Sequence, residues 1–113
     1  MRRRTSSLRP QNAWRTSNHQ RFTEVDAGVL SRDSSIGAFF IFRHEFVHAS
    51  QRADLVKVLG SGALRITQAP QGAGAETSAQ RNGLLSFVGA RGVRGTLDLS
   101  DDTVTLKPAH PGG

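Results

Sequence analysis

The chain has 113 residues, a formal net charge of +6 and no cysteine. This length accommodates one domain rather than two, and the lack of cysteine excludes a disulfide framework and a thiolate metal site. The longest apolar run, residues 37–42, is far shorter than the roughly 20 residues of a membrane-spanning helix, so we expect no membrane span.

Residues 1–23 are predicted to form a disordered basic arm. They contain six arginines and no acidic residue, whereas residues 24–113 contain nine basic and nine acidic residues, so the whole excess charge lies in the arm. The arm has too few large apolar side chains to offset the entropy of ordering it. Guanidinium groups bind phosphates, and an aromatic ring among them can stack on a base. The residues expected to contact a polyanion, RNA or DNA, are Arg2, Arg3, Arg4, Arg9, Trp14, Arg15 and Arg21.

A solvated or targeting tail is the alternative interpretation of the arm. An arginine- and serine-rich beginning without acids is typical of an organelle transit peptide, and no apolar stretch of a secretory signal follows residues 1–4. We therefore expect a cytoplasmic protein or, if the arm is a transit peptide, an organellar one, and not a Sec-secreted one.

Residues 24–108 are predicted to form a single small domain with one helix. Residues 33–35, Asp-Ser-Ser, are typical of a helix N-cap. The apolar residues that follow recur at spacings of three and four, which favours an amphipathic helix over residues 43–52; residues 39–42 fit a helix or a strand. The predicted apolar stripe consists of Phe39, Phe42, Phe46, Ala49 and Ala53.

The chain from residue 55 onward has the pattern of β-structure. Residues 55–59 and 63–67 flank Gly60-Ser61-Gly62 and are predicted to form a hairpin, while residues 69–82 have the composition of a loop. Residues 84–88 are predicted to form a third strand. Residues 96–99 and 103–106 alternate strictly between apolar and polar and are predicted to pair around a turn at residues 100–102.

These elements predict an α+β fold, in which one amphipathic helix covers a small antiparallel sheet of four or five strands. An all-β barrel is the alternative. Residues 109–113 are expected to form a disordered tail.

The segment His44-Glu45-Phe46-Val47-His48 matches the zinc-binding pattern H-E-x-x-H. On a helix, residues i and i+4 lie side by side, so both imidazoles reach one Zn²⁺ and Glu45 is placed to deprotonate a metal-bound water. In these residues the chain resembles the zincin metallopeptidases. The resemblance implies His44 and His48 as ligands, Glu45 as the general base, and Asp54 or Glu76 as a third ligand. The alternative is a solvent-facing helical turn that carries two histidines and a glutamate.

A second glycine-rich segment, residues 89–95, contains Arg91 and Arg94. Its amides and the two guanidinium groups could bind a phosphate, or the segment could be a plain turn with exposed arginines.

Two function classes remain from the sequence. We favour a small non-catalytic binding module, able to self-associate and without a cofactor, whose arginine-rich arm contacts a polyanion. The alternative is a minimal zinc-dependent hydrolase, with Zn as its cofactor, and a protein of no assignable biochemical function is the third possibility.

Overall fold

The computed structural model describes residues 8–17, 20–69 and 83–107, and all of its regular structure there is β. Strands β1 to β4 form one antiparallel sheet, sheet A, and strands β5 to β8 form a second, sheet B, each in chain order. No helix long and apolar enough to cross a membrane occurs in the described part of the chain. The strands are β1 (Leu8–Ser17), β2 (Arg21–Leu30), β3 (Asp33–Glu45), β4 (Ser50–Val58), β5 (Leu64–Gln68), β6 (Leu84–Gly89), β7 (Arg94–Asp98) and β8 (Thr103–Leu106).

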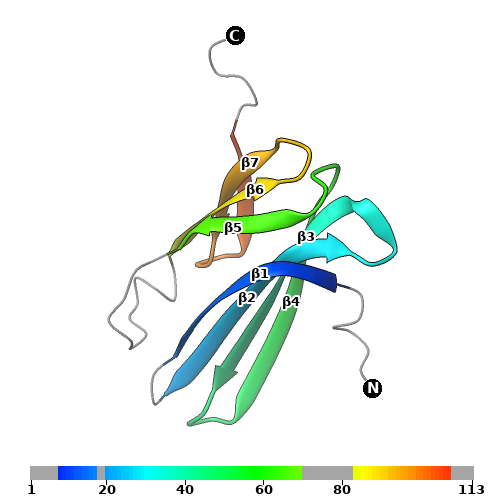
Figure 1. The fold of residues 1–113 in the computed structure, drawn as a ribbon. Helices are drawn as coiled ribbons and strands as arrows, with labels where there is room; N and C mark the ends of the chain where they lie inside the picture. Colours follow the sequence, from blue (N-terminus) through cyan, green and yellow to red (C-terminus); the bar gives the residue numbers. More distant parts are fainter. Residues whose placement is uncertain (1–7, 18–19, 70–82, 108–113) are drawn as a thin grey trace.

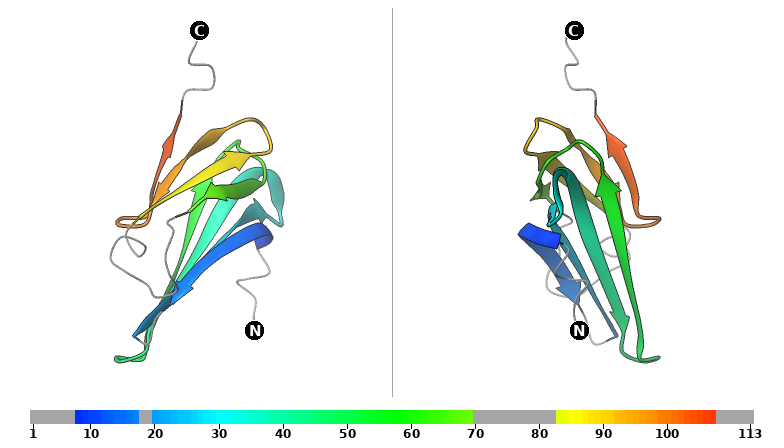
Figure 2. Two further views of the ribbon diagram at one scale, coloured as in Figure 1. Left: turned by 60° about the vertical axis from the view of Figure 1, so that its left-hand side comes forward. Right: turned by 90° about the vertical axis from the view of Figure 1, so that its right-hand side faces the viewer.

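The two sheets pack face to face as an open β-sandwich. Figures 1 and 2 show that sheet B lies over the upper part of sheet A, while the lower ends of β2, β3 and β4 extend beyond it. At the centre of the core, the rings of Phe39 and Phe87 meet edge to face, with centroids 5.1 Å apart. The buried core consists of Val25, Ala27, Phe39, Ile41, Val58, Leu64, Ile66, Leu85, Phe87, Leu97 and Leu99.

The predicted α+β fold is wrong, because the segment expected to be a helix is the tip of a β-hairpin. Strand β3 ends at Glu45, residues 46–49 form the turn, and Ser50 begins β4. Strands β2 and β4 both hydrogen-bond to β3, which therefore satisfies its backbone without helical bonds. Phe39 is buried in the core while Phe42 lies on the opposite face of sheet A, so the helical stripe does not exist. The alternative of a closed barrel also differs from the two separate sheets.

The predicted disordered arm is wrong for the residues that the structure describes. Leu8–Ser17 is β1, and the expected boundary between residues 23 and 24 falls inside β2. Leu8 and Thr16 are buried, and Trp14 packs against the core, which offsets the entropy of ordering this strand. Residues 1–7 and the predicted tail, residues 109–113, lie outside the described residues.

The strand predictions in the second half of the chain have mixed outcomes. The segment around Gly60 and Gly62 is not a hairpin turn, because β4 and β5 belong to different sheets and the chain crosses between them there. The predicted final hairpin is confirmed: β7 pairs with β8, with Leu97 opposite Val104. Most of the predicted loop, residues 70–82, lies outside the described residues.

One polar side chain connects the two sheets along one side of the sandwich. A register shift in β1 directly precedes Asn12, where β1 passes over β5. The Asn12 side-chain amide donates to the carbonyl oxygen of Ile66 at 2.9 Å, and its oxygen accepts from the Ile66 N–H at 2.9 Å. The side chain thus fills the place that a neighbouring strand would take beside β5 at this point.

Replacing Asn12 tests how much the sandwich depends on this contact. Asn12→Ala leaves the partly buried N–H and carbonyl of Ile66 without these two partners, which should lower the free energy of unfolding by about 2–3 kcal/mol. Asn12→Asp keeps the acceptor and loses the donor, so it should also destabilise. Urea denaturation measures both, and a loss below about 0.5 kcal/mol for both variants would contradict the assignment.

Candidate functional site

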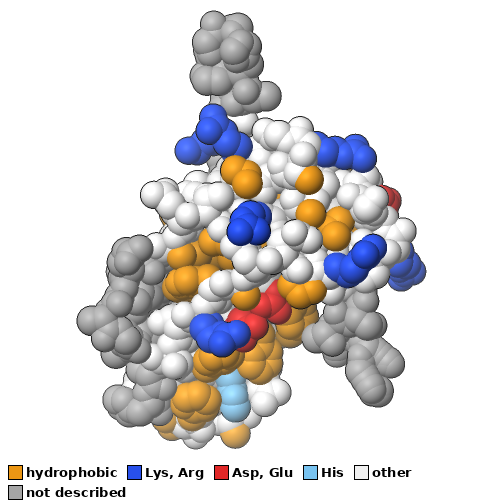
Figure 3. Space-filling view, viewed as in Figure 1, with side chains coloured by type: hydrophobic (Ala, Val, Ile, Leu, Met, Phe, Trp, Pro, Cys, Tyr) orange, Lys and Arg blue, Asp and Glu red, His pale blue; other side chains and the backbone are white. Residues whose placement is uncertain are grey.

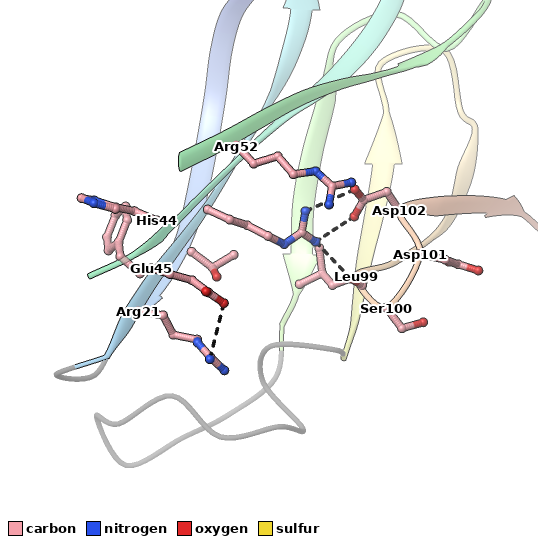
Figure 4. Close-up of a pocket in the computed structure, with 11 residues that line it drawn as sticks. Arg21, His44, Glu45, Arg52, Leu99, Ser100, Asp101 and Asp102 are labelled. Atoms are coloured by element: carbon pink, nitrogen blue, oxygen red, sulfur yellow. Dashed lines mark hydrogen bonds and ion pairs between the residues drawn. The ribbon is translucent and has the colours of Figure 1, made fainter. Parts of the chain in front are cut away.

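The inner face of sheet A is hollowed where it extends beyond sheet B. A cavity of about 220 Å³ lies between the lower ends of β2, β3 and β4 and the turn that joins β7 to β8 (Figure 4). Its charged lining residues are Arg21, Arg43, Glu45, Arg52, Asp101 and Asp102. Strand alternation places Arg21, Arg43, Glu45 and Arg52 on this inner face, because cross-strand partners share a face.

The cavity is organised by Arg43 of β3. Its guanidinium group donates to both carboxylate oxygens of Asp102, at 2.8 and 3.2 Å, and to the carbonyl of Leu99 at 3.0 Å. Asp102 adopts a left-handed backbone conformation, φ 58°, which aspartate tolerates better than most residues. This bidentate pair joins the lower part of sheet A to the β7–β8 turn of sheet B.

The other arginines that line the cavity also have carboxylate partners. Arg21 lies 3.5 Å from Glu45, and Arg52 donates to Asp54 at 3.0 Å. The arginines that line the cavity are thus each paired with a carboxylate. Its clearest role is to hold the two sheets together.

The structure separates the side chains of the predicted zinc motif. In Figure 4 the His44 ring points away from Asp102, and it packs on the outer face of sheet A against Phe46, with centroids 4.9 Å apart. Glu45 faces inward toward Arg21. His48 lies in the turn after β3, where it lines a second hollow together with Glu45.

The helical geometry on which the zinc hypothesis depended is therefore missing. Of the two candidate third ligands, Asp54 forms an ion pair with Arg52 and lies 3.9 Å from Arg43. Glu76 lies outside the described residues. Among the residues that the structure describes, no three histidine or acidic side chains come together in a group that could hold a metal ion.

The residues expected to contact a polyanion lie in three different environments. Arg2, Arg3 and Arg4 lie outside the described residues. Trp14 packs against the core, and Arg15 and Arg21 pair with Glu24 and Glu45. Arg9, Arg91 and Arg94 are exposed and form no ion pair in the described part of the chain.

The outer face of sheet A is a second candidate, which the sequence analysis missed. Cross-strand pairing places Glu24 beside Phe42 and Asp26 beside Phe40. Period-two alternation of Val25, Ala27 and Val29 could have identified β2 and the acidic pair on its other face. This outer face is formed by Ala13, Arg15, Phe22, Glu24, Asp26, Ala38, Phe40, Phe42, His44, Ala53, Leu55 and Lys57.

The pKa of Asp26 on this face is raised by its surroundings. Partial burial raises the pKa of Asp26 to about 6, and two effects of Glu24 add to the rise: it accepts a hydrogen bond from the protonated Asp26 carboxyl, and its charge repels the ionised form. Arg15, which lies 3.7 Å from Glu24, acts in the opposite direction. The face thus holds a carboxyl that is poorly compensated within the described chain.

Comparison with known proteins yields no match to a family model, a curated protein or a solved structure.

Removing the charge of Asp102 tests the structural role of the cavity. Asp102→Asn keeps a side chain that tolerates the left-handed backbone but removes the ionic pairing with Arg43, so we expect the free energy of unfolding to fall by about 2 kcal/mol. Asp101→Asn, a neighbouring exposed acid in the same turn, is the matched control and should change stability by less than about 0.5 kcal/mol. Equal effects of the two variants in urea denaturation would rule out the inter-sheet role.

The pKa of Asp26 predicts how stability changes with pH. Because the folded-state pKa lies above the unfolded value, the native state binds more protons between about pH 4 and pH 6, and stability should fall as the pH rises through this window. Solvent screening limits the loss to roughly 1 kcal/mol. The charged neighbours are Glu24 on β2 and Arg15 on β1, and the strand register places Lys57 on β4 and His44 on β3 further away.

Asp26→Asn should remove this loss, so its stabilising effect in urea denaturation is larger at pH 7 than at pH 4. Asp33→Asn is an informative control, because hydrogen bonds from Ser35 hold the pKa of Asp33 below its usual value. Its effect on the pH dependence has the opposite sign. A pH profile identical to the wild type in Asp26→Asn would contradict the assignment.

Proposed function

We propose that the protein is a non-catalytic binding module that contacts a polyanion, with nucleic acid as the candidate, through basic side chains at one end of its sandwich. The observation that carries the proposal is the division between paired and unpaired cations. At the lower end, Arg15, Arg21, Arg43 and Arg52 all pair with carboxylates. At the other end the described arginines form no ion pair.

This second end, called here the basic end, is defined by Arg9, Arg32, Arg91 and Arg94. The turns that carry Arg32 and Arg91 meet there through the segment between β4 and β5. Gly62 donates its N–H to Ser35, which follows the first turn, and Arg91 donates its N–H to Ser61. Arg9 lies opposite Val29, beside the first of these turns. Lys and Arg side chains are spread over the upper part of the face shown in Figure 3.

The acidic residue at the basic end leaves most of this charge uncompensated. Asp33 accepts hydrogen bonds from the N–H and hydroxyl of Ser35, and Arg91 contributes to its lowered pKa. Exposed arginines around a set of turns can follow the phosphates of a backbone, release counterions and bind without reading sequence. Such binding needs neither a catalytic group nor a cofactor.

Fluorescence anisotropy with a labelled single-stranded oligonucleotide and a labelled duplex tests the proposal at several salt concentrations. We expect affinity to fall steeply with salt, and Arg32→Gln/Arg91→Gln to reduce the slope of log K against log salt by about 2. Arg15→Gln/Arg52→Gln removes the same charge from exposed, paired arginines at the lower end and is the matched control. Binding that is insensitive to salt, or equally weakened by both double variants, would refute it.

Deleting residues 1–7 in the same assay separates the contribution of Arg2, Arg3 and Arg4 from that of the basic end. The deletion spares β1, whereas removing residues 1–23 would take away one whole strand and part of another. If the truncated protein loses all affinity although its urea denaturation is unchanged, the segment before β1 and not the basic end binds the polyanion.

A further inference from the structure

The outward positions of sheet A have the composition of a covered surface. In a two-layered sandwich the outward side chains of a strand are usually polar. Here the outward side chains of β3 are Ala38, Phe40, Phe42 and His44, and its inward ones include Phe39 and Ile41. A strand that is apolar on both sides is typical of a sheet with a layer on each face.

This outer face is only partly open: Ala38 on it is fully buried, Phe40 and Phe42 are half-buried, and Leu55 is exposed. The β5 strand and the core lie on the inner side of sheet A. Figure 3 shows apolar side chains at the surface over the lower part of the molecule, with acidic side chains and a histidine among them. Leu55 on β4 is 40 % exposed, and Phe46, in the turn that follows β3, is 44 % exposed.

The acidic pair decides what kind of group can cover the face. Glu24 and Asp26 are separated by one residue on β2, and Asp26 lies between Ala13 on β1 and Phe40 on β3. A purely apolar cover would bury two carboxylates that have a single described cation, Arg15, beside them, which is costly. A second copy, packed face to face, would add its own Glu24 and Asp26 together with Arg15 and Lys57, and so would bring no net positive charge to the interface. An occupant that brings cations together with apolar side chains satisfies both features of the face.

We propose that the outer face of sheet A is a docking surface for a basic amphipathic segment of another protein, in which cationic side chains sit over Glu24 and Asp26 and flanking apolar side chains cover Phe40, Phe42 and Leu55. The face also carries Arg15 and Lys57, so the cations of the segment are expected over the acidic pair and not over the face as a whole. The docking does not depend on the proposed polyanion binding. Neighbouring outward positions on a strand are roughly 7 Å apart, which matches two cations at alternate positions of an extended segment.

The full-length protein, labelled with ¹⁵N, can be titrated with the synthetic peptide acetyl-Leu-Lys-Leu-Lys-Leu-amide while its NMR spectrum is followed. We expect shift changes at the outward residues of β2, β3 and β4. A cation seated over Asp26 also lowers the pKa of its carboxyl from about 6, which a carbon-detected titration with and without peptide measures. Acetyl-Ser-Lys-Ser-Lys-Ser-amide and acetyl-Leu-Glu-Leu-Glu-Leu-amide test the apolar and charge requirements separately and should bind weakly.

Variants of the protein localise the effect. Glu24→Gln/Asp26→Asn should lower the affinity for the lysine peptide by about tenfold. The fold should be kept, since the double substitution removes negative charge from partly buried positions. Asp98→Asn/Asp101→Asn removes the same charge from half-buried Asp98 and exposed Asp101 of the β7–β8 hairpin and is the matched control, because asparagine keeps the oxygens that accept from Ser100 and Thr103. Leu55→Ser should weaken binding through the apolar contact alone.

Several results would overturn the proposal. Shift changes confined to other surfaces, equal binding of the glutamate peptide, or unchanged affinity in Glu24→Gln/Asp26→Asn would each do so. Concentration-dependent dimerisation that Leu55→Ser abolishes would assign the face to a second copy. Peptide binding that appears only after residues 1–7 are deleted would assign it to the N-terminal segment of the chain itself.

Discussion

The Asn12 side chain is the contact on which the arrangement of the two sheets most depends. It pairs with both backbone groups of Ile66, and so holds an edge strand of sheet A against an edge strand of sheet B. With β1 held there, Trp14 covers one side of the core and Thr16 is buried. At the lower end, Arg43 and Asp102 make the second polar connection between the sheets. The apolar core supplies the cohesion, and these two contacts specify how the sheets are placed.

The sequence predicted the β-structure of the second half better than that of the first. The β7–β8 hairpin was found because it alternates strictly and has a polar turn. The β2 strand was missed although Val25, Ala27 and Val29 are apolar at every second position. The β1 strand was missed because it is held in place by residues far along the chain, such as Ile66, and no local sequence pattern shows such contacts. The helix prediction failed at β3, where aromatic residues on both faces of a strand imitate helical spacing over a few turns.

The candidate sites were less predictable than the fold, since they depend on which strands become neighbours. The motif at residues 44–48 required a helix, and in a hairpin its side chains alternate between two faces of a sheet. The cavity brings Arg43 of the first half to Asp102 of the second, a pairing that only the sandwich creates. Counting charged residues located the excess arginines in the first part of the chain. The ion pairs that the structure shows decide which arginines are free to bind a polyanion.

Each sheet is built from one continuous stretch of chain, the first ending at Val58 and the second beginning at Leu64. Every strand pairing is therefore between sequence neighbours, so the entropy of loop closure for each pairing is small and sheet formation should be fast for an all-β protein. The slow step of folding is then the docking of one finished sheet on the other. A chain divided within residues 59–63 should yield two fragments that are each unstable alone but assemble when mixed, which makes this molecule suitable as a split reporter.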